Sequence, residues 1–484
     1  MTNHYLLIDI ASKQSYIFSS NKLKENVGAN HVIAHEIFKV LIPKHYETSS
    51  SGQFASYGGG SAILTFDTKH KLKDFVSGLS EELLRDYPGI SLELGCADDD
   101  NGNKSFSKIR DELYGSKQRR RNRNHFETRT IDMGLAARCR SSGFPANASL
   151  DLNVEVDAKQ KLAQASNNKL IGDLGIDEKV FTFSTKIEDL ITDDTNGYKA
   201  VVHVDGNKLG AAMSGDLDRE NYEIQNQKIR TKLDGCMKEL IGKLIPLIDS
   251  RTGKMLCANN HIEINLKMEN GKWVLPIRPI VNAGDDITFI CHGRLGIYLA
   301  EQYIKILADP EIGDMSVSSC AGVAIVHTKY PFYKAYELCN ELCDSAKADS
   351  RSKIGEDANR IQYMISSSGF TGDLDKIIED QFTAAGHELK GQSYSISEFD
   401  RLKQLSADLA FTKNSKWPRN KMMQLKTLLS SSDEALEYHI EESIITAMAV
   451  NKNIKDVRPT CDMQINRAEL YEAIEIIDFF FHPK

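Results

Sequence analysis

The sequence contains no long uninterrupted run of apolar residues, which excludes a protein that crosses a membrane as helices. No stretch of the 484 residues approaches the roughly 18 consecutive apolar positions that a membrane helix needs. The opening MTNHYLLIDIASKQ reaches an acidic residue and a lysine before a signal-peptide core is complete. We therefore expect a cytoplasmic protein without a membrane partner.

Paired cysteine motifs are missing as well. The nine cysteines are scattered without CxxC blocks, so we expect reduced, buried thiols rather than disulfides or a zinc ribbon. Proline and glycine, with 11 and 32 residues, together have an ordinary share of the chain, which excludes collagen-like and wholly disordered chains. The 41% of hydrophobic and 26% of charged residues are typical of globular proteins, and the length predicts roughly two to four domains.

Positive charge is not in excess. The chain has 60 basic and 68 acidic residues and a net charge of −8, which argues against a surface that binds duplex nucleic acid throughout. Small anionic ligands held at a metal ion remain compatible with this charge. The exception is a local cluster of cations in residues 117–123 (KQRRRNR), which we interpret as a solvated loop, with phosphate contacts as the alternative.

The chain contains an internal repeat of low similarity but specific pattern. Residues 5–11 (YLLIDIA) and 201–207 (VVHVDGN) each have the pattern of a short buried strand that ends in an acidic residue. Each strand is followed by a long helical stretch and then by a glycine turn, at residues 57–62 (YGGGSA) and 282–286 (NAGDD). Both turns lead into an apolar strand, so the sequence predicts the same local fold twice.

The two glycine turns differ in charge. Gly60 and Ser61 of the first copy stand where Asp285 and Asp286 stand in the second. One acidic and one acid-free copy of the same turn is the pattern expected when one half of a protein catalyses a reaction and the other half positions a reactant.

The order of elements predicts an α+β protein with two ferredoxin-like (βαββαβ) domains and a helical C-terminal domain. We place the first βαββαβ domain at residues 1–95, a linker or insert with the basic loop at 96–195, the second βαββαβ domain at 196–366 and the helical domain at 367–484. In the second copy we expect strands near residues 200–205, 261–268, 273–281, 286–291, 317–326 and 359–365. Helices are expected near residues 219–249, 294–308, 332–349, 373–391, 396–411, 419–430, 433–450 and 467–481.

Three acidic residues in the second copy have the pattern of a metal site. Asp205 ends an apolar strand, and Gly206 lets the chain turn so that a backbone carbonyl faces the same point as the carboxylate. Asp285 and Asp286 lie at a hairpin tip, where Gly284 permits a ligand to approach the backbone closely. If the two strands are neighbours, the three carboxylates converge.

Such a set of carboxylates suits a nucleotide bound together with a metal ion. Mg²⁺ prefers octahedral oxygen coordination through one or two carboxylates and substrate phosphates. In two-metal catalysis one ion lowers the pKa of an attacking 3′-hydroxyl, while both stabilise the displacement of pyrophosphate. The reaction class is then nucleotidyl transfer, with Mg²⁺ or Mn²⁺ as cofactor. Taken singly, a strand-end aspartate or an Asp-Asp turn is more often a helix cap or a turn former.

One lysine in the second copy is a candidate phosphate ligand. Residues 318–327 (SSCAGVAIVH) have the pattern of a buried strand, and a helix over residues 331–347 follows with a proline in its first turn. Lys347 lies near the C-terminal end of this helix, from where it could reach a triphosphate as a point charge. The alternative is an exposed lysine that complements the helix dipole.

These motifs resemble the palm domains of the large polymerase/cyclase subunit of type III CRISPR effector complexes, which are similar to GGDEF diguanylate cyclases. Residues 9–18 (DIASKQSYIF) and 21–29 (NKLKENVGA) resemble the signature that opens the first palm, and residues 57–62 resemble its glycine hairpin. Residues 204–210 (VDGNKLG) resemble the D-G-D-x-M-G of the second palm, and residues 283–286 (AGDD) resemble its G-G-D-D.

The resemblance implies a fold with two palms and an activity. The family condenses ATP into cyclic oligoadenylates or related second messengers in antiviral defence, with an acceptor nucleotide in the first palm and the metal ions in the second. Effector-complex subunits and RNA are the implied partners besides ATP or another NTP. A stand-alone defence synthase and a homodimer are left open.

The resemblance also assigns site residues. Asp205, Asp285 and Asp286 are the predicted catalytic residues, and together with Gly206 they are the predicted ligands of two Mg²⁺ or Mn²⁺ ions. The glycine hairpin of the first palm would hold the second nucleotide. The predicted nucleotide-binding residues are Gly58, Gly59, Gly60, Ser61, Gly206, Asn207, Gly284 and Lys347.

The sequence departs from the family at several points. The first palm begins at residue 4, so we expect no HD-type DNase domain. The zinc-binding cysteines usual between the palms are reduced to Cys139, so we expect a degenerate zinc ribbon without structural zinc. Ala283 replaces a glycine beside the expected nucleotide, and Asn207 stands where an acidic residue is common.

Two other functions remain as alternatives. The first is a non-catalytic nucleotide- or RNA-binding scaffold subunit of a CRISPR-like effector complex, in which residues 119–123 contact RNA. The second is a diguanylate cyclase that uses GTP, since no motif identifies the base. A separate pair, His31 and His35, has the i, i+4 spacing of zinc ligands, but the sequence identifies no third ligand, and we favour a solvated or core-edge pair.

Overall fold

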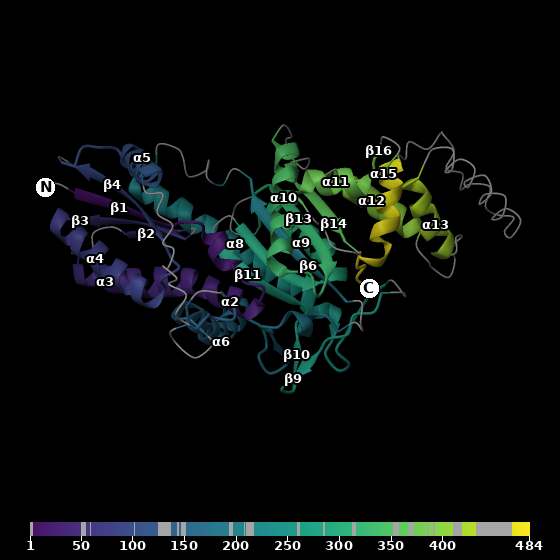
Figure 1. Cartoon of the computed structure of the whole chain (residues 1–484). Helices are drawn as coiled ribbons and strands as arrows, with labels where there is room; N and C mark the ends of the chain where they lie inside the picture. The colour runs from purple at the N-terminus through teal and green to yellow at the C-terminus, as the bar shows by residue number, and fades with distance from the viewer. Residues whose placement is uncertain are drawn as a thin grey trace, which may run out of the picture.

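In the computed structural model, three parts follow one another along the molecule (Figure 1). A four-stranded N-terminal sheet lies at one end, a six-stranded central sheet lies in the middle, and the C-terminal helices lie at the other end. None of the helices in the described part has both the length and the apolar character needed to cross a membrane. The described residues are 3–49, 55–58, 60–100, 102–123, 137–142, 145–146, 152–192, 197–207, 209, 217–258, 262–283, 286–311, 316–351, 358–366, 372–384, 387–390, 393–409, 419–431 and 467–484.

The N-terminal sheet has the strand order β2-β3-β1-β4. β1 (Asn3–Ile10) pairs antiparallel with β3 (Ser61–Phe66) on one side and with β4 (Leu92–Asp99) on the other, while β2 (Ala55–Gly58) pairs with β3. The apolar run of β1 is buried on both faces, as expected for a central strand that is covered on two sides.

Helices cover both faces of the N-terminal sheet. Leu6 and Ile8 of β1 join an apolar cluster with the helices on one face, and Tyr5 and Leu7 join a second cluster on the other face. The helices of this part are α1 (Lys13–Ile17), α2 (Leu23–His31), the π-helix η1 (Val32–Leu41), α3 (Ile42–Ser49), α4 (Lys69–Asp86) and α5 (Phe106–Arg123).

The basic cluster of residues 117–123 lies in helix α5, so the predicted loop is wrong. Phe106, Ile109 and Leu113 of α5 pack in one cluster with Tyr5 of β1. These apolar residues recur at helical spacing and anchor the first half of α5 to the sheet. The cations occupy the C-terminal end of the same helix, beyond its buried residues. β4 also crosses the domain limit predicted at residue 95.

The central sheet repeats the strand order of the N-terminal sheet and extends it. β11 (Ile277–Ala283), β12 (Asp286–His292), β6 (Tyr198–Gly206) and β13 (Ser319–His327) lie in the order β11-β12-β6-β13, all antiparallel. β14 (Arg360–Ile365) is added parallel to β13, and β17 (Tyr394–Ser395) is added antiparallel to β14. The α+β class predicted from the sequence is therefore confirmed.

Strand register confirms the predicted correspondence between the two copies. Asp9 of β1 pairs with Ser61 of β3, and Asp205 of β6 pairs with Asp286 of β12. Because register in antiparallel sheets decides which side chains are direct neighbours, the serine of one copy occupies the place of the aspartate of the other.

Opposite faces of the central sheet carry different helices. Val202 and Val204 of β6 pack in a cluster with α8 and α9, whereas Val201 packs in a cluster with α10. Cys339 of α10 approaches β13 closely at Gly322, where a Cβ atom would collide with the Cys339 carbonyl oxygen. These helices are α8 (Arg219–Leu244), the 3₁₀ turn η4 (Gly293–Leu295), α9 (Gly296–Ala308) and α10 (Phe332–Ser350).

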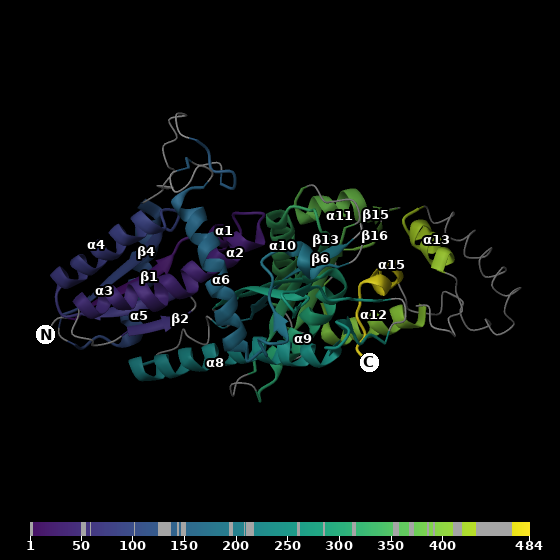
Figure 2. The same ribbon diagram turned by 90° about the horizontal axis from the view of Figure 1, so that it is seen from below.

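Aromatic stacking joins the N-terminal part to the central sheet. The ring of Phe18, just after α1, stacks on Tyr336 of α10 with centroids 3.7 Å apart, and it lies 5.9 Å from the ring of Phe332. α8 runs below both parts when the molecule is turned (Figure 2). From α8, the Asn226 amide donates to the backbone carbonyl of Tyr57 in β2 at 3.0 Å. The two sheets thus share both an apolar core and polar contacts.

The remaining elements before β11 are mostly short, and the strand predicted at residues 261–268 is wrong. Residues 262–267 form no strand, although Ile262, Ile264 and Leu266 are buried; their alternation reflects packing of an irregular segment on the core rather than a sheet ladder. Between α5 and β6 lie α6 (Val154–Leu174), β5 (Phe181–Thr182) and η2 (Ile187–Leu190). Between α8 and β11 lie η3 (Ile245–Leu247), β7 (Ile248–Asp249), β8 (Lys254–Met255), β9 (Met268–Glu269) and β10 (Lys272–Val274).

The C-terminal part is mostly helical, but the helix predicted at residues 373–391 ends early. It ends at Phe382, and the next residues form a small hairpin, because β-branched Thr383 and a glycine at position 386 disfavour a helix there. The helix predicted at residues 433–450 lies outside the described residues. The elements are α11 (Leu374–Phe382), β15 (Thr383–Ala384), β16 (His387–Glu388), α12 (Ile396–Leu409), α13 (Arg419–Leu429), α15 (Arg467–Glu475) and η7 (Ile476–Asp478).

Candidate active site

Two of the three predicted catalytic aspartates lie side by side at the ends of two neighbouring inner strands of the central sheet. Asp205 is the penultimate residue of β6, Asp286 is the first residue of β12, and the two are direct cross-strand partners. Their carboxylates and the ring of His203 offer ligand atoms that all lie within 4.8 Å of one another. The third aspartate, Asp285, lies outside the described residues together with Gly284 and Gly59.

His203 is a further residue of the candidate site and was not among the residues predicted from the sequence. It lies two positions before Asp205 on β6, so both side chains point to the same face of the sheet. The ring is buried, and its Nδ1 lies 2.9 Å from Oγ1 of Thr288, its cross-strand partner. The sequence signal for His203 was its position in residues 201–205 (VVHVD). Residues two positions apart in a strand share a face, so a polar residue two places before a candidate ligand lies on the same face as that ligand.

The predicted phosphate ligand Lys347 contacts the same acidic group. Its ammonium forms an ion pair with Oδ2 of Asp205. Burial lowers the pKa of Lys347, but the adjacent Asp205, with Asp286 beyond it, outweighs burial and raises the pKa above its ordinary value. The lysine therefore remains charged over the pH range in which enzymes work, and its side chain is about a quarter exposed, at 26%.

Gly206 and Asn207 have structural partners within the central part. Gly206 closes β6, and a Cβ atom there would lie 2.6 Å from the side chain of Leu209. The Asn207 amide donates to the carbonyl of Ala358 at 3.1 Å and to the hydroxyl of Ser350 at 3.3 Å. The described contacts of Asn207 thus hold the chain after β6 against the end of α10.

The glycine hairpin of the first copy lies at the equivalent strand ends of the N-terminal sheet, between β2 and β3. Gly58 ends β2 and Ser61 begins β3, and the two are cross-strand partners. Gly60 has a φ of 72°, in the left-handed region that favours glycine, and a Cβ atom there would lie 3.1 Å from the side chain of Lys13. The hairpin tip therefore lies against a lysine side chain.

A pocket of about 320 Å³ lies where the edges of the two sheets meet. Its wall includes Asp286 from the central sheet, and all its other residues come from the N-terminal part. Gln14 bridges the two parts, because its amide donates to Oδ2 of Asp286 at 3.0 Å. The residues that line the pocket are Asp9, Ile10, Ser12, Lys13, Gln14, Ser15, Glu93, Lys117, Arg121 and Asp286.

The acidic strand end of the N-terminal sheet is neutralised by lysines. Nζ of Lys13 lies 2.7 Å from Oδ1 of Asp9, and Nζ of Lys117 lies 2.7 Å from Oδ2. Burial alone would raise the pKa of Asp9, but the two ammonium groups hold it below its ordinary value. Lys117 belongs to α5, the helix after β4, just as Lys347 belongs to α10, the helix after β13. A lysine at a strand-end aspartate is therefore a feature of both copies.

The charge of the pocket is mixed. Arg121 of α5 lies 3.4 Å from Glu93 of β4, and Glu93 is the cross-strand partner of Asp9. The N-terminal side thus offers three cations beside two acids, and the central side offers Asp286. Such a surface can receive an anionic ligand such as a phosphate on the N-terminal side and a cation on the central side.

Comparison with known proteins identifies the fold. In sequence comparisons, no family model and no curated protein matches this chain. Among solved structures, Csm1 in T.onnurineus matches with 14% identity and a TM-score of 0.58, over 98% of this chain and 69% of that chain. A Csm1–Csm4 cassette in complex with pppApApA matches with 15% identity and a TM-score of 0.58, over the same shares of the two chains.

A third solved structure extends the comparison to a larger assembly. The Csm1–Csm4 subcomplex in the type III-A CRISPR-Csm interference complex matches with 14% identity and a TM-score of 0.57, over 98% of this chain and 70% of that chain. At such low identity the similarity establishes the fold alone. The chain has a Csm1-like α+β fold.

Proposed function

We propose that this protein is a metal-dependent nucleotidyltransferase that condenses NTPs, with ATP as the expected substrate, into cyclic oligonucleotide second messengers. The observation that carries the proposal is the cross-strand pair of Asp205 and Asp286, in which Asp205 contacts Lys347 and Asp286 lines a pocket shared with the N-terminal part. In this proposal the two sheets with their helices are the two palms, and the central one is catalytic.

The aspartates at the strand ends of the central sheet fit a divalent cation. Asp205 and Asp286 supply carboxylate oxygens within 4.8 Å of one another, and both side chains are partly exposed. One or two carboxylates with room for water and phosphate oxygens is the ligand set that Mg²⁺ and Mn²⁺ prefer. Such a cation would supply Lewis-acid activation of the 3′-hydroxyl and charge neutralisation at the transferring phosphoryl group.

The chain itself would bind and orient the two nucleotides. We expect the Lys347 ammonium, which now contacts Asp205, to contact the triphosphate of the donor nucleotide as a point charge. On the N-terminal side, Lys13, Lys117 and Arg121 supply positive charge for the acceptor, and Gly60 gives the hairpin a tip without a side chain. Holding two reactants in one geometry supplies a large part of the rate in reactions of this kind.

The comparisons support this proposal through the ligands of the matched proteins. Csm1–Csm4 cassettes have been solved in complex with AMPPNP, with pppApA and with the cyclic products cA3 and cA4. They also make a Csm4-like subunit the first partner to test for this chain, with RNA as a further candidate. Several of the matched structures pair Csm1 with Csm4, and none of those named above supports the homodimer left open by the sequence.

Conversion of radiolabelled ATP in the presence of Mn²⁺ tests the proposal. Asp286→Asn should reduce product formation about 100-fold or more, because it removes a charged ligand while keeping the size of the side chain. Asp111→Asn, at an exposed position on α5, is the matched control and should behave as wild type. Mass spectrometry of a reaction with all four NTPs then identifies the base and the ring size.

A non-catalytic scaffold is the second candidate. The cations of α5 at residues 119–123 favour it, because they lie on an exposed helix end where a nucleic-acid backbone can reach them. Equal traces for wild type and Asp286→Asn, together with salt-sensitive RNA binding that is lost in Arg119→Ala/Arg120→Ala, would favour the scaffold over the enzyme.

A further inference from the structure

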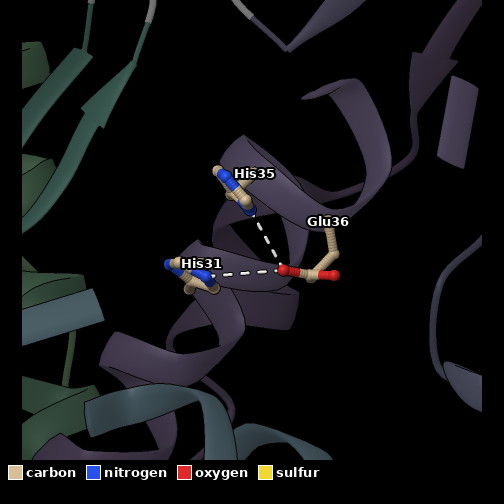
Figure 3. A group of neighbouring side chains, drawn as sticks. All are labelled: His31, His35 and Glu36. Atoms are coloured by element: carbon tan, nitrogen blue, oxygen red, sulfur yellow. Dashed lines mark hydrogen bonds and ion pairs between the residues drawn. The ribbon is translucent and has the colours of Figure 1, made fainter. Parts of the chain in front are cut away.

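The consecutive helices α2 and η1 of the N-terminal part carry a second cluster of side chains that can bind a metal ion, far in sequence from the aspartate pair. His31, His35 and Glu36 offer ligand atoms that all lie within 4.8 Å of one another. Figure 3 shows the two imidazole rings side by side and the carboxylate directed toward both. The sequence favoured a solvated or core-edge histidine pair, because it identifies no third ligand. Glu36 is that third ligand.

The backbone explains why Glu36 joins the histidines. α2 ends at His31, and the π-helix η1 begins at the next residue and runs to Leu41. In an α-helix a residue five positions on lies about 140° round the axis, so only His35 would share the face of His31. In a π-helix the hydrogen bond runs from i to i+5, which brings the fifth residue over the first. The amide of Ile42 shows this pattern, because it donates to the carbonyl of Ile37.

The distances match those of a metal ligand set. Oε1 of Glu36 lies 3.5 Å from Nε2 of His31 and 3.0 Å from Nδ1 of His35. Ligand atoms bound tetrahedrally to zinc at about 2.0–2.2 Å lie roughly 3.3 Å apart. The two rings are stacked with centroids 4.8 Å apart and an interplanar angle of 22°. Small side-chain rotations therefore suffice to direct all three groups at one ion.

Burial and exposure also fit a site that is anchored on one side and open on the other. His31 is buried, whereas the side chains of His35 and Glu36 are 32% and 21% exposed. An ion can thus enter from solvent and keep one position for water.

We infer that His31, His35 and Glu36 form a binding site for Zn²⁺ or a similar borderline divalent cation, separate from the aspartate pair that the proposed function uses. Two imidazoles and one carboxylate are a recurrent zinc ligand set, and imidazole ligands disfavour Mg²⁺. A bound ion would link His31, the last residue of α2, to His35 and Glu36 of η1, and would so stabilise the junction of the two helices.

One neighbouring charge opposes the ion and so provides a specific test. Lys169 of α6 is an electrostatic neighbour of both His31 and Glu36, and α6 packs along α2. Lys169 is itself partly buried, and Glu36 and Asp173 partly offset its charge. Lys169→Met should therefore tighten metal binding several-fold, an effect that a merely structural histidine pair would not show.

The experiment titrates tag-free, chelator-treated protein with Co²⁺ and follows the visible absorption of the ion, with Zn²⁺ as competitor. Wild type should bind a single Co²⁺ at this site, and Zn²⁺ should displace it and raise the melting temperature. His35→Gln and Glu36→Gln, both at partly exposed positions, should weaken binding about tenfold or more. His70→Gln, at an exposed histidine on α4, is the matched control and should bind as wild type.

Further variants separate this site from the aspartate pair. Asp286→Asn should keep the Co²⁺ signal, so that failure of the proposed nucleotidyl transfer and failure of this inference give different results. The inference is overturned if His35→Gln and Glu36→Gln titrate as wild type, if the signal is lost in Asp286→Asn, or if wild type gives no signal. Circular dichroism of the metal-free variants checks that they are folded.

Discussion

The amide of Gln14 in the N-terminal part donates a hydrogen bond to Oδ2 of Asp286 in the central sheet, at 3.0 Å. Residue 14 and residue 286 come from different copies of the repeat, so the bond connects one half of the candidate site to the other. Both residues line the pocket between the two parts. Gln14 is therefore a positioning residue in the proposed reaction.

Gln14→Ala should lower the rate of product formation about tenfold or more, because a misplaced catalytic group loses much of the advantage of orientation. The effect should fall on kcat rather than on KM for ATP, and the melting temperature should stay near that of wild type, since the stacking of Phe18 on Tyr336 still joins the two parts. Gln118→Ala, on the exposed side of α5, is the control. An unchanged kcat in Gln14→Ala would contradict this role.

Lys347→Ala should raise KM for ATP about tenfold, because it removes the charge that we assign to the triphosphate. Binding of Mn²⁺ should not weaken, since Asp205 loses a competing cation. Lys334→Ala, at an exposed position of the same helix, should leave both constants unchanged. If instead Mn²⁺ binding is lost and KM is unchanged, Lys347 supports the aspartate rather than the nucleotide.

Gly322→Ala should destabilise the central part by about 1–3 kcal/mol, the range of overpacking in a close-packed core. The added methyl would meet the Cys339 carbonyl oxygen and lie 2.7 Å from the Cys343 amide nitrogen, and both are backbone atoms of α10 that cannot rotate away. Gly242→Ala, on α8 with nothing within 4 Å of the added Cβ, should stabilise by about 0.5–1 kcal/mol. Urea midpoints of the two variants measure the contrast, and a midpoint for Gly322→Ala equal to that of wild type would refute the packing argument.

Glu472 makes the stability of the C-terminal part depend on pH. Burial raises the pKa of this carboxyl from 4.5 to about 7, while Lys390 and the hydroxyls of Tyr363 and Tyr394 only partly offset burial. Because the folded pKa is the higher one, the stabilisation is fully present below about pH 4.5 and is lost as the pH rises through about 7.

Glu472→Gln should remove this pH dependence. The glutamine keeps the shape and the hydrogen-bonding capacity of the protonated acid but cannot ionise. Between pH 5.5 and pH 8, the melting temperature of wild type should therefore fall more than that of the variant, and the two should be closest at the lower pH. Parallel curves for the two proteins would show that Glu472 is not the titrating group.

The sequence by itself determined the repeat, the strand ends and the candidate acids. Apolar runs that end in Asp9 and Asp205 are local signals, and because strands bury alternating side chains, local patterns suffice to recognise them. The α+β class and the equivalence of Ser61 with Asp286 followed from the same patterns. Charge alone was a poor guide, because the predicted basic loop is the end of α5, which is anchored by apolar residues earlier in the helix.

Only the tertiary structure decided which side chains meet. His203, Gln14 and the lysines at Asp9 join the candidate site through strand register and helix packing, which link residues far apart in the chain. Glu36 meets His31 because the helix changes to π geometry, a change that no propensity of residues 31–36 announces. Composition and periodicity report the surroundings of one segment at a time, whereas a site is made where several segments converge, and that convergence depends on the packing of the whole chain.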